Sequence, residues 1–276
     1  MASYQDNSVK FIRNSRLNQV ELRFSRYRQQ VFDKHTHDTY SIGIVIEGQT
    51  KFFCHNRTEV IERGEIALIN PGEVHACNPR VGSALTYYML YIEPTLIQAV
   101  LEDLLENKVK VEFILPIVRD KRMYRTLMHV SRAMTNADDV LEIETLLYET
   151  LAEIMQRFGE GKPQKPTQMQ GVDKLIASGR AYMMDNLFQN ISLDELAMHS
   201  GLSPFHFLRE FRKRYGLPPH TYQLQQRITR AKHLLVQGKP IAHVATDVGF
   251  ADQSHFTRKF KACVGTTPRR YQLANR

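Results

Sequence analysis

LDELAMHSGLSPFHFLREF, from Leu193 to Phe211, is the stretch that decides the fold of this 276-residue chain. A second version, IAHVATDVGFADQSHFTRKF, follows from Ile241 to Phe260. Each copy carries a glycine at the equivalent place: Gly201 in the first copy and Gly249, 48 positions later, in the second. The pattern predicts a short apolar helix, a glycine turn and a second helix with basic residues on its outer face, which is the helix-turn-helix plan.

The two copies also match beyond the turn, after which the second copy has one additional residue. Seven residues recur 49 positions later: His206, Phe207, Arg209, Phe211, Gly216, Pro219 and Tyr222. Ser192 and Glu195 have the spacing of a capping box, which marks the start of a helix. We therefore expect an all-α domain with helix-turn-helix units over about 193–215 and 241–264.

Charge is divided unequally between the two halves of the chain. Residues 170–276 hold 16 basic and 7 acidic residues, a balance of +9, whereas residues 1–169 hold 21 and 22, a balance of −1. A basic domain beside a neutral one indicates a phosphate-bearing partner for that domain alone. The alternative is a small helical bundle with a merely solubilising basic surface.

The last hundred or so residues resemble the AraC/XylS family of bacterial transcription regulators. The run Ile241–Lys261, followed by Gly265, Pro268 and Tyr271, is similar to the family signature. The resemblance implies that one long helix, from about 221 to 237, joins the two helix-turn-helix units. The resemblance and the outward helix positions together give a set of expected DNA-binding residues: Phe205, His206, Leu208, Arg209, Arg212, Lys213, Gln253, Ser254, His255, Thr257 and Arg258. A solvated helix face is the alternative for each. Leu208 departs from the family pattern, so base readout by the first helix should be thin.

The N-terminal half has a different pattern, in which β-favouring stretches alternate with turn signals. Strands are expected over 20–27, 40–47, 50–54, 59–61, 66–69 and 85–92. Such short, evenly spaced strands predict a small β-barrel or jelly roll. Helices should follow over 95–106, 121–134 and 140–158. The segment from His35 to His75 resembles the two halves of a cupin motif and the effector domain of many AraC-type regulators.

That resemblance implies a pocket inside the barrel for a small-molecule effector. The expected effector-binding residues are His35, His37, Tyr40, His75 and Tyr88. The three histidines could instead ligate a metal. Metal cupins usually add a glutamate after the second histidine, and this chain has none there, so we expect no metal and no other cofactor. A purely structural role is the further alternative.

The segment 159–171, with three glycines and two prolines, predicts a linker. The expected fold class is α+β: a cupin-like domain over 1–158 that binds the effector and dimerises, the linker, and a DNA-binding domain over 172–276. Five apolar residues of the predicted helix 140–158 have near-heptad spacing: Ile143, Leu147, Leu151, Ile154 and Phe158. They could pair with another subunit or pack against their own barrel.

Several classes of protein are disfavoured by the composition. The three cysteines lack metal or disulfide spacing, which fits a reducing cytoplasm. No stretch has membrane-spanning length, and no phosphate loop or nucleophile motif appears.

The sequence therefore predicts a cytoplasmic, non-enzymatic transcription regulator that binds double-stranded promoter DNA under the control of a small molecule. Family resemblance adds an activating role, contact with RNA polymerase and a homodimer, without a membrane partner. The alternatives are a metal-dependent cupin enzyme fused to a DNA-binding domain, and a regulator that needs no effector.

Overall fold

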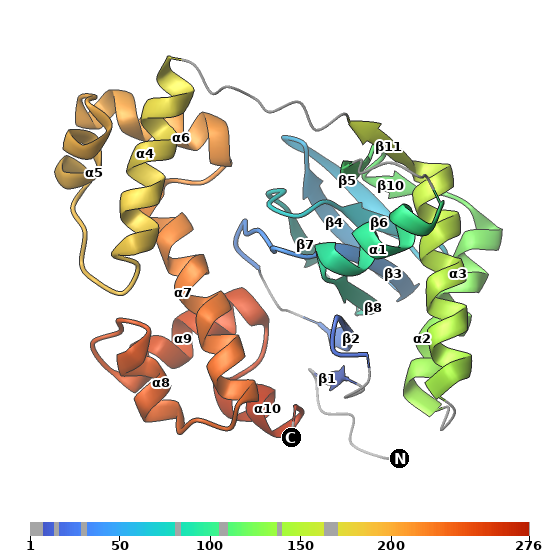
Figure 1. Cartoon of the computed structure of the whole chain (residues 1–276). Helices are drawn as coiled ribbons and strands as arrows, with labels where there is room; N and C mark the ends of the chain where they lie inside the picture. Colours follow the sequence, from blue (N-terminus) through green and yellow to red (C-terminus); the bar gives the residue numbers. More distant parts are fainter. Residues whose placement is uncertain are drawn as a thin grey trace. The chain divides into compact units, whose positions relative to one another are not determined.

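The structure is a computed structural model, and it describes residues 8–13, 17–28, 32–80, 84–104, 110–136, 140–162 and 171–275. Contacts divide the chain into two compact units (Figure 1). The first, here called the β-rich unit, comprises Met1–Phe32 and Thr36–Lys165. The second, the helical unit, comprises Asp33–His35 and Pro166–Arg276. Within the described ranges, no helix has both the length and the apolar character that crossing a bilayer requires.

The β-rich unit is built on two sheets and a small β-ribbon. The larger sheet has the strand order β1-β2-β8-β3-β6-β10, the smaller sheet β5-β4-β7, and the ribbon pairs β9 with β11. All these pairings are antiparallel. The strands are β1 (Ser8–Ile12), β2 (Val20–Tyr27), β3 (Tyr40–Glu47), β4 (Gln49–Cys54), β5 (Arg57–Glu62), β6 (Ile66–Ile69), β7 (Ala76–Pro79), β8 (Leu85–Ile92), β9 (Lys110–Phe113), β10 (Ile117–Val118) and β11 (Gly159–Lys162).

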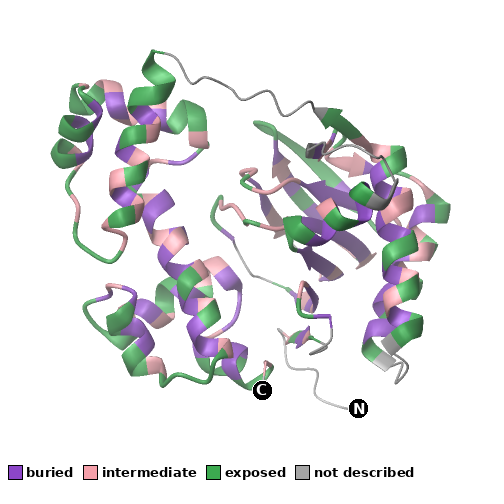
Figure 2. Ribbon diagram, viewed as in Figure 1, coloured by how far each residue is buried: buried purple, intermediate pink, exposed green. Residues whose placement is uncertain are grey.

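Strand alternation sorts the side chains of the larger sheet into two cores, because successive residues point to opposite faces. On one face Ile42 and Leu90 pack against the helices of the unit. On the other face Val45 and Met89 pack with Phe52 of the smaller sheet. Figure 2 shows the resulting burial along the strands. The two sheets therefore enclose an interior, which is where the resemblance placed the effector.

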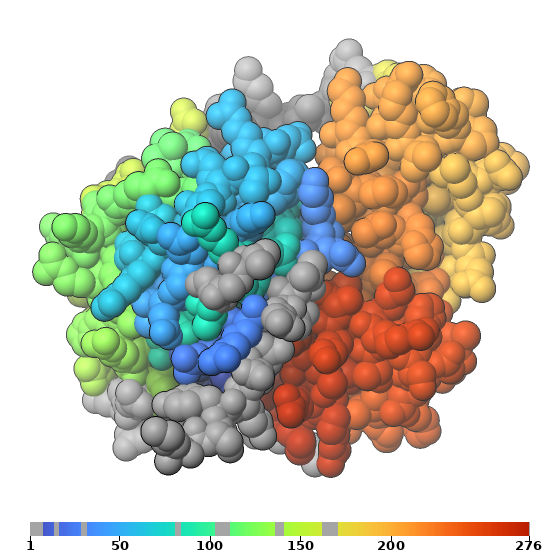
Figure 3. Space-filling view, turned by 180° about the vertical axis from the view of Figure 1, so that it is seen from behind, coloured from blue at the N-terminus to red at the C-terminus, as the bar shows by residue number. Residues whose placement is uncertain are grey.

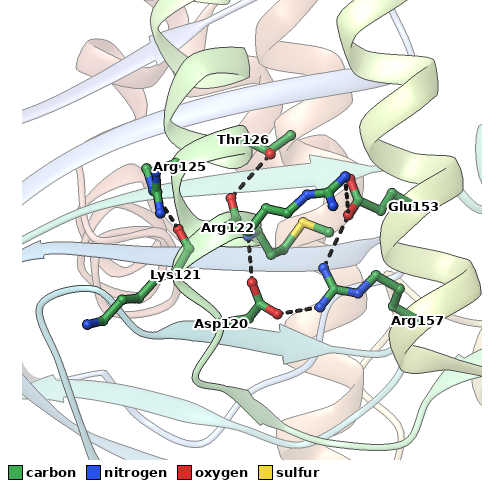
Figure 4. A network of polar contacts seen from close by, with 8 residues as sticks. Asp120, Lys121, Arg122, Arg125, Thr126, Glu153 and Arg157 are labelled. Carbon is green, nitrogen blue, oxygen red and sulfur yellow. Dashed lines mark hydrogen bonds and ion pairs between the residues drawn. The ribbon is translucent and has the colours of Figure 1, made fainter.

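Three helices complete the β-rich unit: α1 (Pro94–Leu104), α2 (Lys121–Asn136) and α3 (Val140–Phe158). A polar network fastens the start of α2 to the end of α3 (Figure 4). Asp120 caps α2 by accepting a hydrogen bond from the Met123 amide at 2.8 Å. Arg157 of α3 donates to Asp120 and, at 3.1 Å, to Glu153. The Met123 amide and the Arg157 guanidinium together lower the pKa of the Asp120 carboxyl.

The helical unit contains the two predicted helix-turn-helix units, the long helix that joins them and two further helices. Its elements are α4 (Val172–Asp185), α5 (Leu193–Ser200), α6 (Pro204–Tyr215), α7 (Pro219–Val236), α8 (Ile241–Asp247), α9 (Gln253–Val264) and α10 (Pro268–Leu273). The sequence did not predict α4 or α10. Helix α4 packs closely on the first helix-turn-helix unit, since a Cβ at Gly179 would lie 2.2 Å from the hydroxyl oxygen of Ser200 in α5.

The α+β fold class is confirmed, but the expected boundary of the linker is corrected. The predicted linker began at Gly159, whereas Gly159–Lys162 forms β11 and pairs with β9. Hydrogen bonding to β9 overrides the low strand propensity of this glycine-containing segment. The stretch 163–170, where the rest of the predicted linker falls, lies outside the described residues. The long connecting helix was expected over about 221–237 and runs over Pro219–Val236.

Candidate nucleic-acid interface and effector site

The first helix-turn-helix unit comprises α5 and α6, and its caps follow from the sequence. The Ser192 hydroxyl accepts a hydrogen bond from the Glu195 amide at 3.1 Å, and the Glu195 carboxylate accepts one from the Ser192 amide at 2.6 Å. This confirms the capping box. Gly201 ends α5 with φ of 63°, a left-handed conformation that glycine adopts without steric cost. Ser203 then caps α6 through the His206 amide.

The second unit, α8 and α9, repeats this construction with a different cap. Asp252 accepts a hydrogen bond from the His255 amide at 2.7 Å, which confirms it as the N-cap of α9. Gly249 has φ of 77° and meets a further constraint, since a Cβ there would lie 2.3 Å from the Phe188 carbonyl oxygen. The turn of the second unit therefore packs backbone to backbone on the loop that follows α4.

Each second helix buries one aromatic face and exposes the opposite one. Phe207 and Phe211 of α6 and Phe256 and Phe260 of α9 are 0% exposed. Of the expected DNA-binding residues, those that are exposed are Phe205, Arg209, Arg212, Lys213, Gln253, Ser254 and Arg258; those that are half-buried are His206, Leu208, His255 and Thr257. The α6 residues thus lie on one unit and the α9 residues on the other, as the repeat requires.

Helix α7 joins the two units, and Arg227 anchors it. Its guanidinium donates hydrogen bonds to three backbone carbonyl oxygens: Leu187 at 2.8 Å, Gln189 at 2.8 Å and Gly249 at 2.9 Å. Burial lowers the pKa of Arg227. This side chain therefore ties the loop after α4 and the turn of the second unit to the connecting helix. The sequence analysis missed it, since an arginine on a helix normally predicts an exposed position.

In the β-rich unit, Arg23 is a buried cation between the two sheets. It lies on β2, is 4% exposed, and donates hydrogen bonds to the hydroxyls of Ser25 at 2.9 Å, Tyr91 at 3.4 Å and Tyr27. The rings of Phe11 and Phe32 lie 5.6 and 5.7 Å from its guanidinium carbon.

The charge of Arg23 is not neutralised by these neighbours. Burial raises the pKa of Tyr91 and holds that of Tyr87 well above its usual value, so both phenols are neutral. Glu21, on the same face of β2, forms an ion pair with Arg13. In the described part of the chain, no carboxylate pairs with Arg23.

His37 and His75, two of the expected effector residues, lie near Tyr91, the tyrosine to which Arg23 donates a hydrogen bond. The His37 ring lies 5.0 Å, between centroids, from both the His75 ring and the Tyr91 ring. His75 is 2% exposed, and its Nδ1 lies 3.0 Å from the Glu73 carbonyl oxygen. His35 belongs to the short segment Asp33–His35 that groups with the helical unit, and its Nδ1 lies 2.7 Å from the Asp33 carbonyl oxygen.

Tyr40 and Tyr88, also expected in the effector pocket, lie on the other face of the larger sheet. Tyr40 belongs to the core beneath the helices, where its hydroxyl donates to the Val111 carbonyl oxygen at 2.5 Å, and Tyr88 packs against the same core. For Tyr88 the reason is strand alternation: its side chain points to one face of β8, whereas those of Tyr87 and Tyr91 point to the other face. These two tyrosines therefore do not share the interior in which His37 and His75 lie, and their role in effector binding stays a prediction.

The apolar face of α3 is occupied within its own unit. Ile143, Leu147, Leu151 and Ile154 belong to the core beneath the helices, and Phe158 packs against it. Of the two interpretations of the near-heptad spacing, packing against the unit itself is thus confirmed. This face is not available for pairing with a second subunit.

Comparison with known proteins identifies similar sequences for both units. A family model described as AraC-like ligand binding domain matches residues 17–151, and one described as Helix-turn-helix domain matches residues 196–274. The HTH-type transcriptional activator AarP of Providencia stuartii is 34% identical over 112 residues, which are 40% of this chain and 82% of AarP. The uncharacterized HTH-type transcriptional regulator YbfI of Bacillus subtilis is 27% identical over 231 residues, 82% of each chain.

The fold is also similar to that of a solved structure. ToxT from Vibrio cholerae, in a structure with a bound unsaturated fatty acid, matches with a TM-score of 0.58 and 13% sequence identity. The match covers 97% of this chain and 95% of that chain.

Proposed function

Because the chain belongs to the AraC/XylS family of transcription regulators, we propose that α6 and α9 each enter the major groove of promoter DNA. We propose further that a small anionic molecule, bound between the sheets of the β-rich unit, controls this binding. The chain is a DNA-binding regulator with a ligand-binding domain; the residues that make each contact and the chemistry of the effector are the proposal.

The DNA contacts are supported by the repeat and by charge. The exposed faces of α6 and α9 carry Arg209 and Arg258 at equivalent positions, 49 residues apart, within the half of the chain whose balance is +9. Arginine can contact both acceptors of a guanine edge in the major groove. Arg212 and Lys213 are exposed on the later turns of α6, where phosphate contact would orient the helix.

The single observation that carries the effector proposal is the buried charge of Arg23. A cation removed from water is costly unless an anion pairs with it, and the hydrogen bonds of Arg23 go to hydroxyl groups. A carboxylate could make a bidentate contact with this guanidinium. Tyr91 links Arg23 to His37, so the proposed site comprises Arg23, Tyr27, His37, His75 and Tyr91. The fatty acid of the ToxT structure also carries a carboxylate.

The interior is closely packed, so effector binding must move side chains. A cavity of about 20 Å³ lies between the sheets, lined by Tyr87 and Met89 among others. That volume suits about one water molecule. Displacement of an aromatic ring such as Phe32 would make room for an acid, and such a change is a means of signalling effector binding.

An activating role, contact with RNA polymerase and a homodimer are further parts of the proposal, supported by the family and, for activation, by the similarity to the transcriptional activator AarP. A cytoplasmic location is also part of the proposal, because a regulator of this family acts on DNA. No enzymatic step is proposed, since the relatives are regulators. Leu141 and Tyr148, exposed on the outer side of α3, are candidates for a dimer contact.

Thermal melting with a panel of carboxylic acids and their primary amides tests the effector proposal. An acid that binds the folded chain should raise its melting temperature, and its amide should not. Arg23→Met should abolish that rise, whereas Arg23→Lys, which keeps the charge, should retain part of it. The control is Arg26→Met on the same strand, where the native arginine lies 3.7 Å from Glu47. If amides stabilise the chain as well as acids, or if Arg23→Met still responds, the anionic effector is excluded.

A further inference from the structure

A Cys-His-Glu cluster lies on the β-rich unit at the turn between β4 and β5. Cys54 ends β4, Arg57 begins β5, and His55 and Asn56 form the two-residue connection. Both turn residues have positive φ, 48° and 59°, as in the type I′ turn of a tight hairpin. Residues other than glycine are uncommon at positive φ, and asparagine and histidine are among those that adopt it most readily. The β4–β5 hairpin lies at the surface of its unit (Figure 3, light blue).

Glu73 completes the cluster from the turn that follows β6, and its carboxylate is held in place. The Asn70 amide donates to Glu73 Oε2 at 3.0 Å, and Asn70 Nδ2 lies 3.5 Å from the same oxygen. Asn70 is itself fixed by the Phe113 backbone, through bonds of 2.8 and 3.1 Å. The other oxygen, Oε1, contacts Nε2 of His55. One oxygen is thus anchored while the second is directed at the cluster.

The three donor atoms are close enough to share one ion. The Cys54 sulfur, a His55 ring nitrogen and a Glu73 carboxylate oxygen all lie within 4.8 Å of one another. Zinc binds these three donor types at about 2.0–2.3 Å with tetrahedral geometry, which places neighbouring ligand atoms under 4.8 Å apart. We propose that Cys54, His55 and Glu73 bind a zinc ion. This site shares no residue with the effector site of the proposed function, although the Glu73 carbonyl oxygen lies 3.0 Å from His75 Nδ1.

The mixture of donors favours zinc over other common cations. A thiolate ligand disfavours Mg²⁺ and Ca²⁺, which take oxygen ligands, and imidazole with thiolate is a usual zinc set. The anchoring of Glu73 by Asn70 is the kind of outer contact that orients a metal ligand. When the ion binds, the thiol loses its proton, and the sulfur coordinates as thiolate.

The surroundings of the cluster also favour a cation. His55, Asn70 and Glu73 line an open surface pocket of about 540 Å³, together with Glu112 and Glu160. These two glutamates are directly opposite each other in the β9–β11 ribbon. Like charges in directly opposed positions destabilise a sheet, and a nearby divalent cation relieves that repulsion. Three protein ligands leave the fourth zinc position for water or another donor on the pocket side.

Cobalt(II), which replaces zinc and reports its ligands by absorption, tests the site on the full-length chain. We expect about one Co²⁺ per chain, with a thiolate-to-cobalt charge-transfer band that Zn²⁺ abolishes by displacement. Cys54→Ser should eliminate the band. Cys77→Ser and Cys263→Ser, at the other two cysteines, should retain it. A histidine-only metal site would give no thiolate band, and that result, or a band that survives Cys54→Ser, would overturn the proposal.

His55→Gly provides a variant that keeps the fold. Glycine accepts the positive φ of this exposed position, so the metal-free variant should melt at or above the temperature of the parent. Its affinity for Zn²⁺, measured by competition with a chromophoric chelator, should fall by at least about tenfold, and Glu73→Gln should have a similar effect. If both variants bind Zn²⁺ as tightly as the parent, these residues are not its ligands.

Discussion

Arg209 and Phe211 lie two positions apart on α6, and their replacement should have opposite consequences. Arg209 and its equivalent Arg258 are exposed. Arg209 pairs with Glu210 at 3.0 Å, a surface contact that contributes little stability. Arg209→Ala and Arg258→Ala should therefore melt like the parent but lose about 1–3 kcal/mol of DNA affinity, selectively at the base that each contacts. Fluorescence anisotropy on single-base variants of the site measures this loss.

Phe211→Ala and Phe260→Ala provide the matching pair, because both rings are 0% exposed. Each deletion leaves a cavity in its helix-turn-helix core and should cost about 3–5 kcal/mol of unfolding free energy. Urea denaturation of the four variants compares the two sets directly. Arginine variants that unfold early, combined with phenylalanine variants that only lose DNA affinity, would mean that the binding faces are assigned the wrong way round.

At this scale the sequence predicted some positions well and others poorly. The burial of Phe207 and Phe211 follows from helical spacing within a repeated unit, so it could be predicted. The tyrosines of β8 could not be assigned to a face, since apolar and aromatic residues occupy both faces of a strand that is buried on both sides. Arg23 was missed for a related reason: an arginine in a strand normally marks the solvent face, and only tertiary contacts bury it.

Each helix-turn-helix unit depends on its glycine turn, and the two turns should differ in how well they tolerate replacement of glycine by alanine. Gly201 and Gly249 both have positive φ, but a Cβ at Gly201 meets nothing within 4 Å, whereas one at Gly249 lies 2.3 Å from the Phe188 carbonyl oxygen. Gly201→Ala should cost about 1–2 kcal/mol, the price of a left-handed alanine.

Gly249→Ala should cost more than Gly201→Ala, because the turn must also move away from Phe188 and thereby disturb the carbonyl that Arg227 holds. Calorimetric melting of both variants, together with their DNA affinities, checks this order. Equal losses of melting temperature in the two variants would show that the close approach at Gly249 has no energetic consequence.

Among the elements, those with a strong local pattern could be predicted and those that depend on distant partners could not. Strands β2, β3, β6 and β8 were predicted with the bounds that the structure gives them. Strand β7, which contains a proline, and β11, which contains two glycines, have little intrinsic strand propensity and form because they pair with segments distant in sequence. Helix α4 lacks a side-chain N-cap, which removes its clearest start signal.

For the molecule as a whole, the division of charge and the repeat predicted a DNA-binding half correctly, while the ligand chemistry of the other half needed the structure. The proposed effector site joins Arg23 to Tyr91, which is far from it along the chain. The proposed zinc site joins Cys54 and His55 to Glu73, and these residues form no known sequence motif. The helical unit is the part whose function depends on rigidity. Helix α7 has 18 residues, which gives a length of about 27 Å. Arg227 fixes it to the loop after α4 and to the turn between α8 and α9.

The central claim is that one chain reads two adjacent major-groove segments, about 34 Å apart, with α6 and α9 held as a rigid pair. Its most direct test is the affinity of the full-length chain for a site selected from random DNA, with base pairs inserted between the two contacted segments. An insertion of about five base pairs turns the second segment to the opposite face of the duplex and should remove most of the specific affinity. A full-turn insertion of about ten should fail as well, because α7 cannot lengthen; recovery of affinity at the full turn would contradict the rigid pair.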